Sequence, residues 1–296
     1  MQIVLKKISL ADITGKEVLC MDMKTSEEII YDSAKRGSKA LEELRSVFQY
    51  RDLIYQLVRR DIVARYKRSV LGIAWTMLQP LGMMVVISIV FSQLFHRIGG
   101  YPVYVLSGLI SWNFFSQTTN ATIHQMVWGG PLLRKIYMPQ TSFALSAVGT
   151  GLVNISLSII PLILIMFFVG VPVRWTLLFL PISMFLLAAF ALGIGLWIST
   201  LAVFFPDISE MFQIVLIGWM YLTPIIYPFD IISERLQIWF KLNPMYHFVQ
   251  IFRLPVYEGR LPSLLMLTTG IGIALITLIS GWIVFSHKAD EFSYRT

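Results

Sequence analysis

Five basic side chains lie just before the first long apolar stretch of the chain. They are Arg59, Arg60, Arg65, Lys67 and Arg68. A guanidinium group presents paired N–H donors that match two phosphate oxygens, whereas a lysine acts as a point charge. The cluster is therefore suited to binding phosphate groups. Ordinary anionic lipids would be attracted as well, at about 1 kcal/mol per basic residue near a membrane surface.

A run of polar side chains interrupts the second apolar segment. Its members are Asn113, Gln117, Thr118, Asn120, His124 and Gln125. Spacings of three and four residues place four of them on one face of a helix, namely Asn113, Gln117, Asn120 and His124. Such a face suits a hydrated conduit and equally suits hydrogen bonds to neighbouring helices. Both interpretations stay open at this point.

Patterns for catalysis are missing from the chain. There is no G-x-x-x-x-G-K-[ST] phosphate loop, no H-E-x-x-H and no G-x-S-x-G, and the four histidines are scattered. A single cysteine, Cys20, excludes an internal disulfide and any multi-cysteine metal site. We therefore expect no enzyme activity, metal or cofactor in this chain. Because carboxylates are nearly absent from the apolar segments, a transporter of this kind would take its energy from another subunit.

The elements that must position these residues are membrane helices. Of the 296 residues, 56% are hydrophobic and 14% are charged, and the mean hydropathy is +0.70, which is too apolar for a soluble domain of this size. From Gly72 to Phe205 the only charged residues are Arg97, Arg134, Lys135 and Arg174. The net charge is +7, and the excess basic residues lie beside apolar segments, which indicates contact with anionic lipid rather than nucleic acid.

Six segments are long enough to cross a hydrocarbon core, which takes about 20 helical residues. They cover residues 72–95, 103–127, 141–169, 177–205, 208–227 and 261–286. Of the 24 Lys and Arg residues, 18 fall on one side of these segments and six on the other. The positive-inside rule then predicts that both termini are cytoplasmic. No cleavable signal peptide is evident, because the first 71 residues are polar.

The flanking and connecting regions give further expectations. Residues 41–71 have the period of an amphipathic helix that lies on a membrane or packs on a partner, with Asp61 and Arg65 spaced for an ion pair. Residues 1–40 are expected to be a cytoplasmic extension, as a small hairpin or a disordered tail, and residues 287–296 a cytoplasmic tail. Segment 228–260 predicts short external helices that re-enter the membrane. Asp207 is expected to cap the fifth span, with Glu210 three residues on.

Several motifs in order resemble one known family. RDIVARYKRSVLGIAWTMLQPL at residues 60–81 is followed by LLRKIYMPQTSFALS at 132–146, and then by AVFFPDI, TPIIYP and LNPMYHF. These resemble the permease subunits of bacterial ABC exporters for polysaccharides such as O-antigen, capsule and teichoic acid. The resemblance runs from about Leu44 to the end of the chain. Two features depart from the family: Pro206 stands where a basic residue is expected, and residues 1–40 form an extension.

The resemblance implies a half-transporter in the bacterial cytoplasmic membrane. Two copies would form the channel, and two copies of a separate ABC ATPase would bind ATP and magnesium. The family's coupling helix maps to the internal loop at residues 128–139, where the expected contacts are Leu132, Leu133, Arg134, Lys135, Ile136 and Tyr137. A second interpretation is that Arg134 and Lys135 only set the topology. The resemblance also implies that the basic cluster at residues 59–68 contacts the polyprenyl pyrophosphate that anchors the glycan, with Arg65 and Arg68 as the more specific contacts.

A glycan that slides through a protein favours aromatic faces and polar side chains. The expected pathway residues are Phe91, Phe95, Tyr101, Tyr104, Asn113, Gln117, Asn120, Tyr221 and Tyr227. Each aromatic residue alone is also compatible with interfacial anchoring or packing. The sequence thus predicts an all-α polytopic membrane protein with six transmembrane helices, acting as a polysaccharide export permease. The alternatives are an ABC exporter of a lipid or drug and a membrane-embedded glycan transferase.

Overall fold

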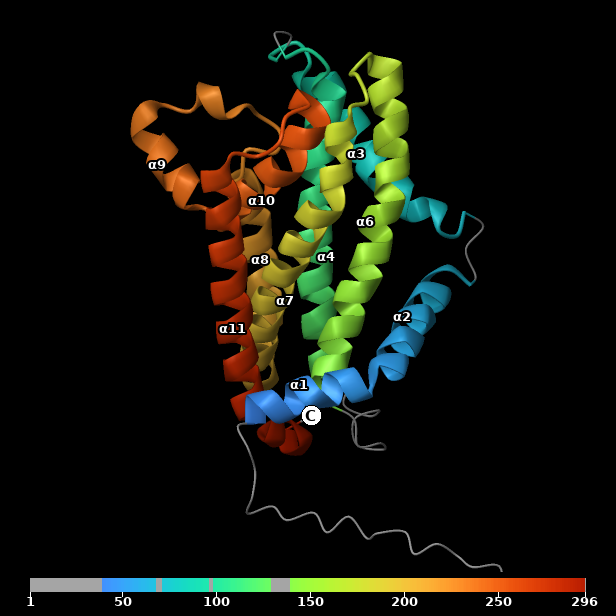
Figure 1. The fold of residues 1–296 in the computed structure, drawn as a ribbon, viewed down its shortest axis with the longest axis vertical. Helices are drawn as coiled ribbons and strands as arrows, with labels where there is room; N and C mark the ends of the chain where they lie inside the picture. Colours follow the sequence, from blue (N-terminus) through green and yellow to red (C-terminus); the bar gives the residue numbers. More distant parts are fainter. Residues whose placement is uncertain (1–38, 68–70, 96–97, 129–138, 296) are drawn as a thin grey trace, which may run out of the picture. The chain divides into compact units, whose positions relative to one another are not determined.

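The computed structural model describes residues 39–67, 71–95, 98–128 and 139–295, and residues 37–296 form one compact unit. Every regular element in these ranges is helical, which confirms the all-α class (Figure 1). The predicted extension at 1–40 lies almost entirely outside them. The order is α1 (Lys39–Gln49), α2 (Arg51–Tyr66), α3 (Ala74–Phe91), α4 (Tyr101–Trp128), α6 (Thr141–Val169), η3 (Trp175–Phe179), α7 (Leu180–Phe204), α8 (Asp207–Tyr221), η4 (Phe229–Ile231), α9 (Glu234–Leu242), α10 (Pro244–Arg253), η5 (Leu254–Glu258) and α11 (Leu264–Arg295).

Each of the six predicted spans contains a helix. Four segments of the described chain are long and apolar enough to cross a membrane: 74–91, 141–169, 175–204 and 264–288. This confirms a polytopic membrane protein. The two remaining spans stay predictions for different reasons. Helix α4 has 28 residues but carries the polar run, whereas α8 has 15 residues and extends about 22 Å, less than the ~30 Å hydrocarbon core.

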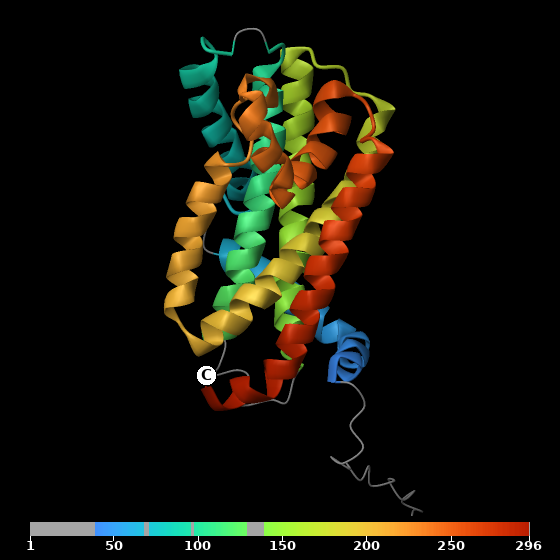
Figure 2. The same ribbon diagram turned by 90° about the vertical axis from the view of Figure 1, so that its left-hand side faces the viewer.

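Helix α4 is the central element of the bundle. It packs against α3, α6, α7, α8 and α10 (Figures 1 and 2). An aromatic cluster joins these helices, in which Phe115 of α4 lies 5.2 Å from both Phe190 and Trp219 between ring centroids. Phe190 stacks in turn on Phe248 of α10, with centroids 4.5 Å apart. The central helix therefore joins α7, α8 and α10 through Phe115 and its aromatic neighbours.

Helices α7 and α11 approach each other closely at two glycines. A β-carbon at Gly193 would stand 2.5 Å from the backbone carbon of Thr277, and one at Gly281 would collide with the carbonyl oxygen of Gly193. Small residues let membrane helices pack backbone to backbone, where van der Waals contact rather than the hydrophobic effect holds them together. The α7–α11 pair thus depends on glycine at both positions.

The amphipathic region differs from the predicted single helix over 41–71. It forms two helices that meet at Tyr50, and α2 ends at Tyr66. Helix α1 packs on α6 and on the long α11, whereas α2 runs along α6, so the chain turns between them (Figure 1). The predicted apolar face of α2 is confirmed, because Leu57 is buried and Val58 fills the space beside Gly149 of α6. This face packs against the chain's own bundle.

The segment between α8 and α11 contains the predicted short helices. Helix α10 lies within the bundle and buries seven of its ten residues, whereas α9 buries none. The predicted cap of α8 is wrong: the helix begins at Asp207 after Pro206, and no side-chain cap bond forms. Asp207 and Glu210 both stand in the first turn, where their negative charge still favours the helix through its dipole.

Candidate functional site

Two adjoining pockets open between α2, α3, α4 and α6. Their volumes are about 250 Å³ and 240 Å³. Both are lined by Arg65, Gln117, Thr118, Gly151 and Asn154. We call the two pockets together the polar groove. The first pocket extends toward Asn113 and Ser158, and the second toward Asp61 and Gln125, so the groove follows the polar run of α4.

Three buried polar atoms on the groove wall have no hydrogen-bond partner within the described part of the chain. They are Thr118 Oγ1, Thr150 Oγ1 and Asn154 Oδ1. The neighbouring Thr119 and Thr122 differ, because their hydroxyls donate to carbonyls one turn earlier in α4. A buried polar atom left without a partner costs about 1–3 kcal/mol, and a bilayer offers no substitute. The groove is therefore built to hold water or a ligand that can form hydrogen bonds.

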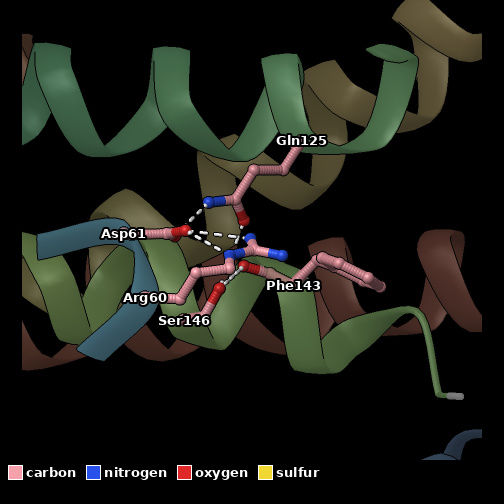
Figure 3. Close-up of polar contacts among 5 residues, drawn as sticks. All are labelled: Arg60, Asp61, Gln125, Phe143 and Ser146. Atoms are coloured by element: carbon pink, nitrogen blue, oxygen red, sulfur yellow. Dashed lines mark hydrogen bonds and ion pairs between the residues drawn. The ribbon is translucent and has the colours of Figure 1, made fainter. Parts of the chain in front are cut away.

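Arg65 supplies the positive charge of the groove. The sequence predicted that it pairs with Asp61, and this prediction is wrong. Asp61 Oδ1 instead accepts from Arg60 at 2.9 Å, and Oδ2 accepts from Gln125 Nε2 at 2.9 Å (Figure 3). Among the described residues, no acidic group pairs with Arg65. The arginine fork therefore stays available to an anion in the groove.

The predicted basic cluster separates into different places. Arg59, Arg60 and Lys67 are exposed, as Arg65 is, but they line neither pocket. Arg68 lies outside the described residues. Arg60 is engaged with Asp61. The structure thus brings one member of the cluster, Arg65, to the polar groove. The predicted coupling residues 132–137 also lie outside the described residues.

The expected glycan-pathway residues occupy two locations. Asn113 and Gln117 line the polar groove with Arg65, whereas Asn120 is half-buried and lines neither pocket. The aromatic members gather around the first turn of α4 and the chain that follows α8. Phe91 and Phe95 stack 6.2 Å apart between centroids, and Tyr221 is exposed. In this conformation Tyr101 and Tyr104 are buried.

Sequence reasoning missed the residue that organises the aromatic location. Arg253 of α10 is 1% exposed, and its Nη1 and Nη2 donate to the carbonyls of Pro224 and Ile225 at 2.9 and 3.0 Å. Tyr101 and Tyr104 donate their hydroxyls to the next two carbonyls, those of Ile226 and Tyr227. We call these contacts the carbonyl clasp. A lone charge within the apolar run IFRLPV was the signal available in the sequence.

The described geometry defines a polytopic helical membrane protein with a polar groove beside a basic helix, an arrangement suited to moving polar material through a membrane. The chain belongs to the ABC-2 type transporter family, whose profile matches residues 52–257. It is 28% identical over 254 residues to the O-antigen export system permease protein RfbA of Myxococcus xanthus, covering 84% of this chain and 97% of that protein.

Two further relatives have related names. The polysialic acid transport protein KpsM of Escherichia coli is 25% identical over 252 residues, covering 83% of this chain and 97% of its own length. The capsule polysaccharide export inner-membrane protein CtrC of Neisseria meningitidis is 23% identical over 217 residues, covering 71% of this chain and 81% of that protein. All three matches extend over most of both chains.

Proposed function

We propose that this chain is the permease subunit of an ABC exporter that moves a polysaccharide, linked to polyprenyl pyrophosphate, across the bacterial cytoplasmic membrane. Family membership and the names of the relatives support the transport of a glycan. The helices long and apolar enough to span a bilayer support residence in the membrane. The excess of basic residues on one side of the apolar segments supports cytoplasmic termini.

One observation carries the assignment of the lipid anchor. Arg65 lines the same groove as Asn113 and Gln117 and has no acidic partner among the described residues. A guanidinium fork binds phosphate oxygens in pairs, and amide side chains suit the hydroxyls of a sugar. The groove thus offers one cation for the pyrophosphate and neutral polar groups for the first sugars. An apolar drug would leave these groups without partners, which disfavours the alternative of a drug exporter.

Energy for export comes from a separate subunit in this proposal. The sequence has no phosphate loop for ATP, so two copies of this chain would assemble with two ABC ATPase subunits that bind ATP and magnesium. The loop at residues 128–139 would receive the push of the ATPase. Arg134 and Lys135 would there meet acidic groups of the partner. Reversing both charges should uncouple ATP hydrolysis from export while insertion into the membrane stays intact.

The proposal is tested on the purified complex. The chain should co-purify with an ATPase in fixed ratio, and polyprenyl pyrophosphate glycan should stimulate ATP hydrolysis more than phosphatidylglycerol does. Arg65→Ala should remove this stimulation, whereas Arg59→Ala, an equal loss of charge on the same helix away from the groove, should keep it. If both variants lose the same fraction of stimulation by both lipids, the basic residues serve only general lipid binding. Absence of an ATPase partner would overturn the proposal as a whole.

A further inference from the structure

Asp61 stands on α2 within reach of two arginines. Arg60 is its neighbour in sequence, and Arg65 follows four residues later, a spacing at which carboxylate and guanidinium meet on one helix face. In the structure neither carboxylate oxygen bonds Arg65: Oδ1 accepts from Arg60, and Oδ2 accepts from Gln125 of α4 (Figure 3). The competing pair with Arg65 is not formed.

Gln125 is itself held in place by α6. The hydroxyl of Ser146 lies 3.2 Å from Gln125 Oε1 and 2.8 Å from the carbonyl oxygen of Phe143, and these two acceptors share its single proton. Ser146 is buried, so the amide of Gln125 is fixed from a rigid helix. The side chain of Asp61 is only 20% exposed, and water competes weakly for it there. Three helices thus set the direction in which the carboxylate points.

We propose that Gln125 is a positioning residue that holds Asp61 away from Arg65 and so keeps the charge of Arg65 available to a phosphate group in the groove. This rests on the proposed function, which assigns the phosphate to a lipid pyrophosphate. Without Gln125, Oδ2 loses its donor while Arg60 stays on Oδ1, and Arg65 has the i,i+4 spacing at which a guanidinium can take the vacated oxygen. Asp61 then becomes an intramolecular competitor of the ligand.

Competition between Asp61 and the ligand for Arg65 predicts how single and double variants should bind. Gln125→Ala should weaken binding about tenfold, the effect of losing one charge-assisted contact. Asp61→Asn removes the competitor and should bind as tightly as the wild type or more tightly. The double variant Asp61→Asn with Gln125→Ala should bind like Asp61→Asn alone, because no carboxylate remains to occupy Arg65. Such a rescue is the signature of a positioning role.

The measurement uses the full-length chain in phosphatidylcholine vesicles, titrated with fluorescent polyprenyl pyrophosphate and, separately, with phosphatidylglycerol. Thr119→Val serves as the control, since it removes a polar group from α4 outside both pockets. Thermal unfolding checks that each variant is folded. Wild-type affinity for Gln125→Ala, or a loss that persists in the double variant, would overturn the inference. If the wild type shows no preference for pyrophosphate over phosphatidylglycerol, the proposed function fails instead, so the two failures are distinguishable.

Discussion

The guanidinium carbon of Arg253 lies 3.8 Å from the centroid of the Tyr104 ring, and the hydroxyl of the same tyrosine donates to the carbonyl of Tyr227 at 3.0 Å. Tyr104 therefore acts twice in the carbonyl clasp, through its ring and through its hydroxyl. The clasped chain at Pro224–Tyr227 is not helical, and backbone carbonyls in a membrane protein need partners from the protein itself. Helices α4 and α10 supply these partners.

Removing Arg253 should destabilise the protein strongly. Arg253→Ala leaves the carbonyls of Pro224 and Ile225 buried without donors and should cost on the order of 3 kcal/mol. Arg253→Lys keeps the charge over the Tyr104 ring but loses the two-pronged geometry, so an intermediate loss is expected. Thermal unfolding in detergent measures the change. Arg235→Ala, at an exposed position of α9, is the control; equal unfolding midpoints for Arg253→Ala and Arg235→Ala would show that the clasp contributes nothing.

The glycine contact between α7 and α11 gives a matched pair of variants on one helix. Gly281→Ala would place a methyl group against the backbone of Gly193 and should cost about 1–3 kcal/mol. Gly272→Ala meets no atom within 4 Å and should be neutral or stabilising by up to about 1 kcal/mol, because alanine loses less backbone entropy. Unfolding midpoints of both variants give the comparison. The same midpoint for the two variants would mean that the helices separate freely at this point.

Thr118 tests whether the polar groove is used. Thr118→Val removes a buried hydroxyl that has no partner among the described residues, so stability should be unchanged or higher by up to about 3 kcal/mol while export falls several-fold. Thr119→Val removes a hydroxyl that donates within α4 and should leave export unchanged. Surface glycan in cells that carry each variant reports export. Normal export by Thr118→Val would place the transported material outside the groove.

The single cysteine tests the orientation of the chain. Cys20 should react with a membrane-impermeant maleimide in inside-out vesicles and stay unlabelled in right-side-out vesicles, because the positive-inside rule predicts a cytoplasmic amino terminus. Cys20→Ser is the negative control for labelling. Modification in right-side-out vesicles alone would reverse the assigned topology.

The sequence predicts much of the helical fold but little of the contact pattern. The third span was predicted as residues 141–169, the bounds that α6 has, because the length of an apolar run is a local property. The break at Tyr50 depends on which neighbours α1 and α2 pack against, and periodicity alone does not contain this information. Pro206 likewise displaced the predicted cap by one residue.

The site shows the same division between local and distant information. Residue type and spacing selected Arg65, Asn113 and Gln117, and the fold brings all three to one pocket. The predicted partner of Asp61 is wrong because helical spacing favours Arg65, whereas the observed partner Gln125 is 64 residues away in the sequence. Arg253 was counted only as a charge on one side of the membrane. Its role follows from carbonyls that only the folded chain places around it.

The most direct test of the account is transport by the reconstituted complex. Vesicles would hold this chain with the proposed ATPase subunit, and a polyprenyl pyrophosphate glycan would be loaded on the side where ATP is supplied. We expect ATP-dependent appearance of the glycan on the opposite side, measured by its cleavage with an added glycosidase, and a strong reduction with Arg65→Ala. No ATP-dependent movement of the glycan by a complex that still hydrolyses ATP would contradict the account.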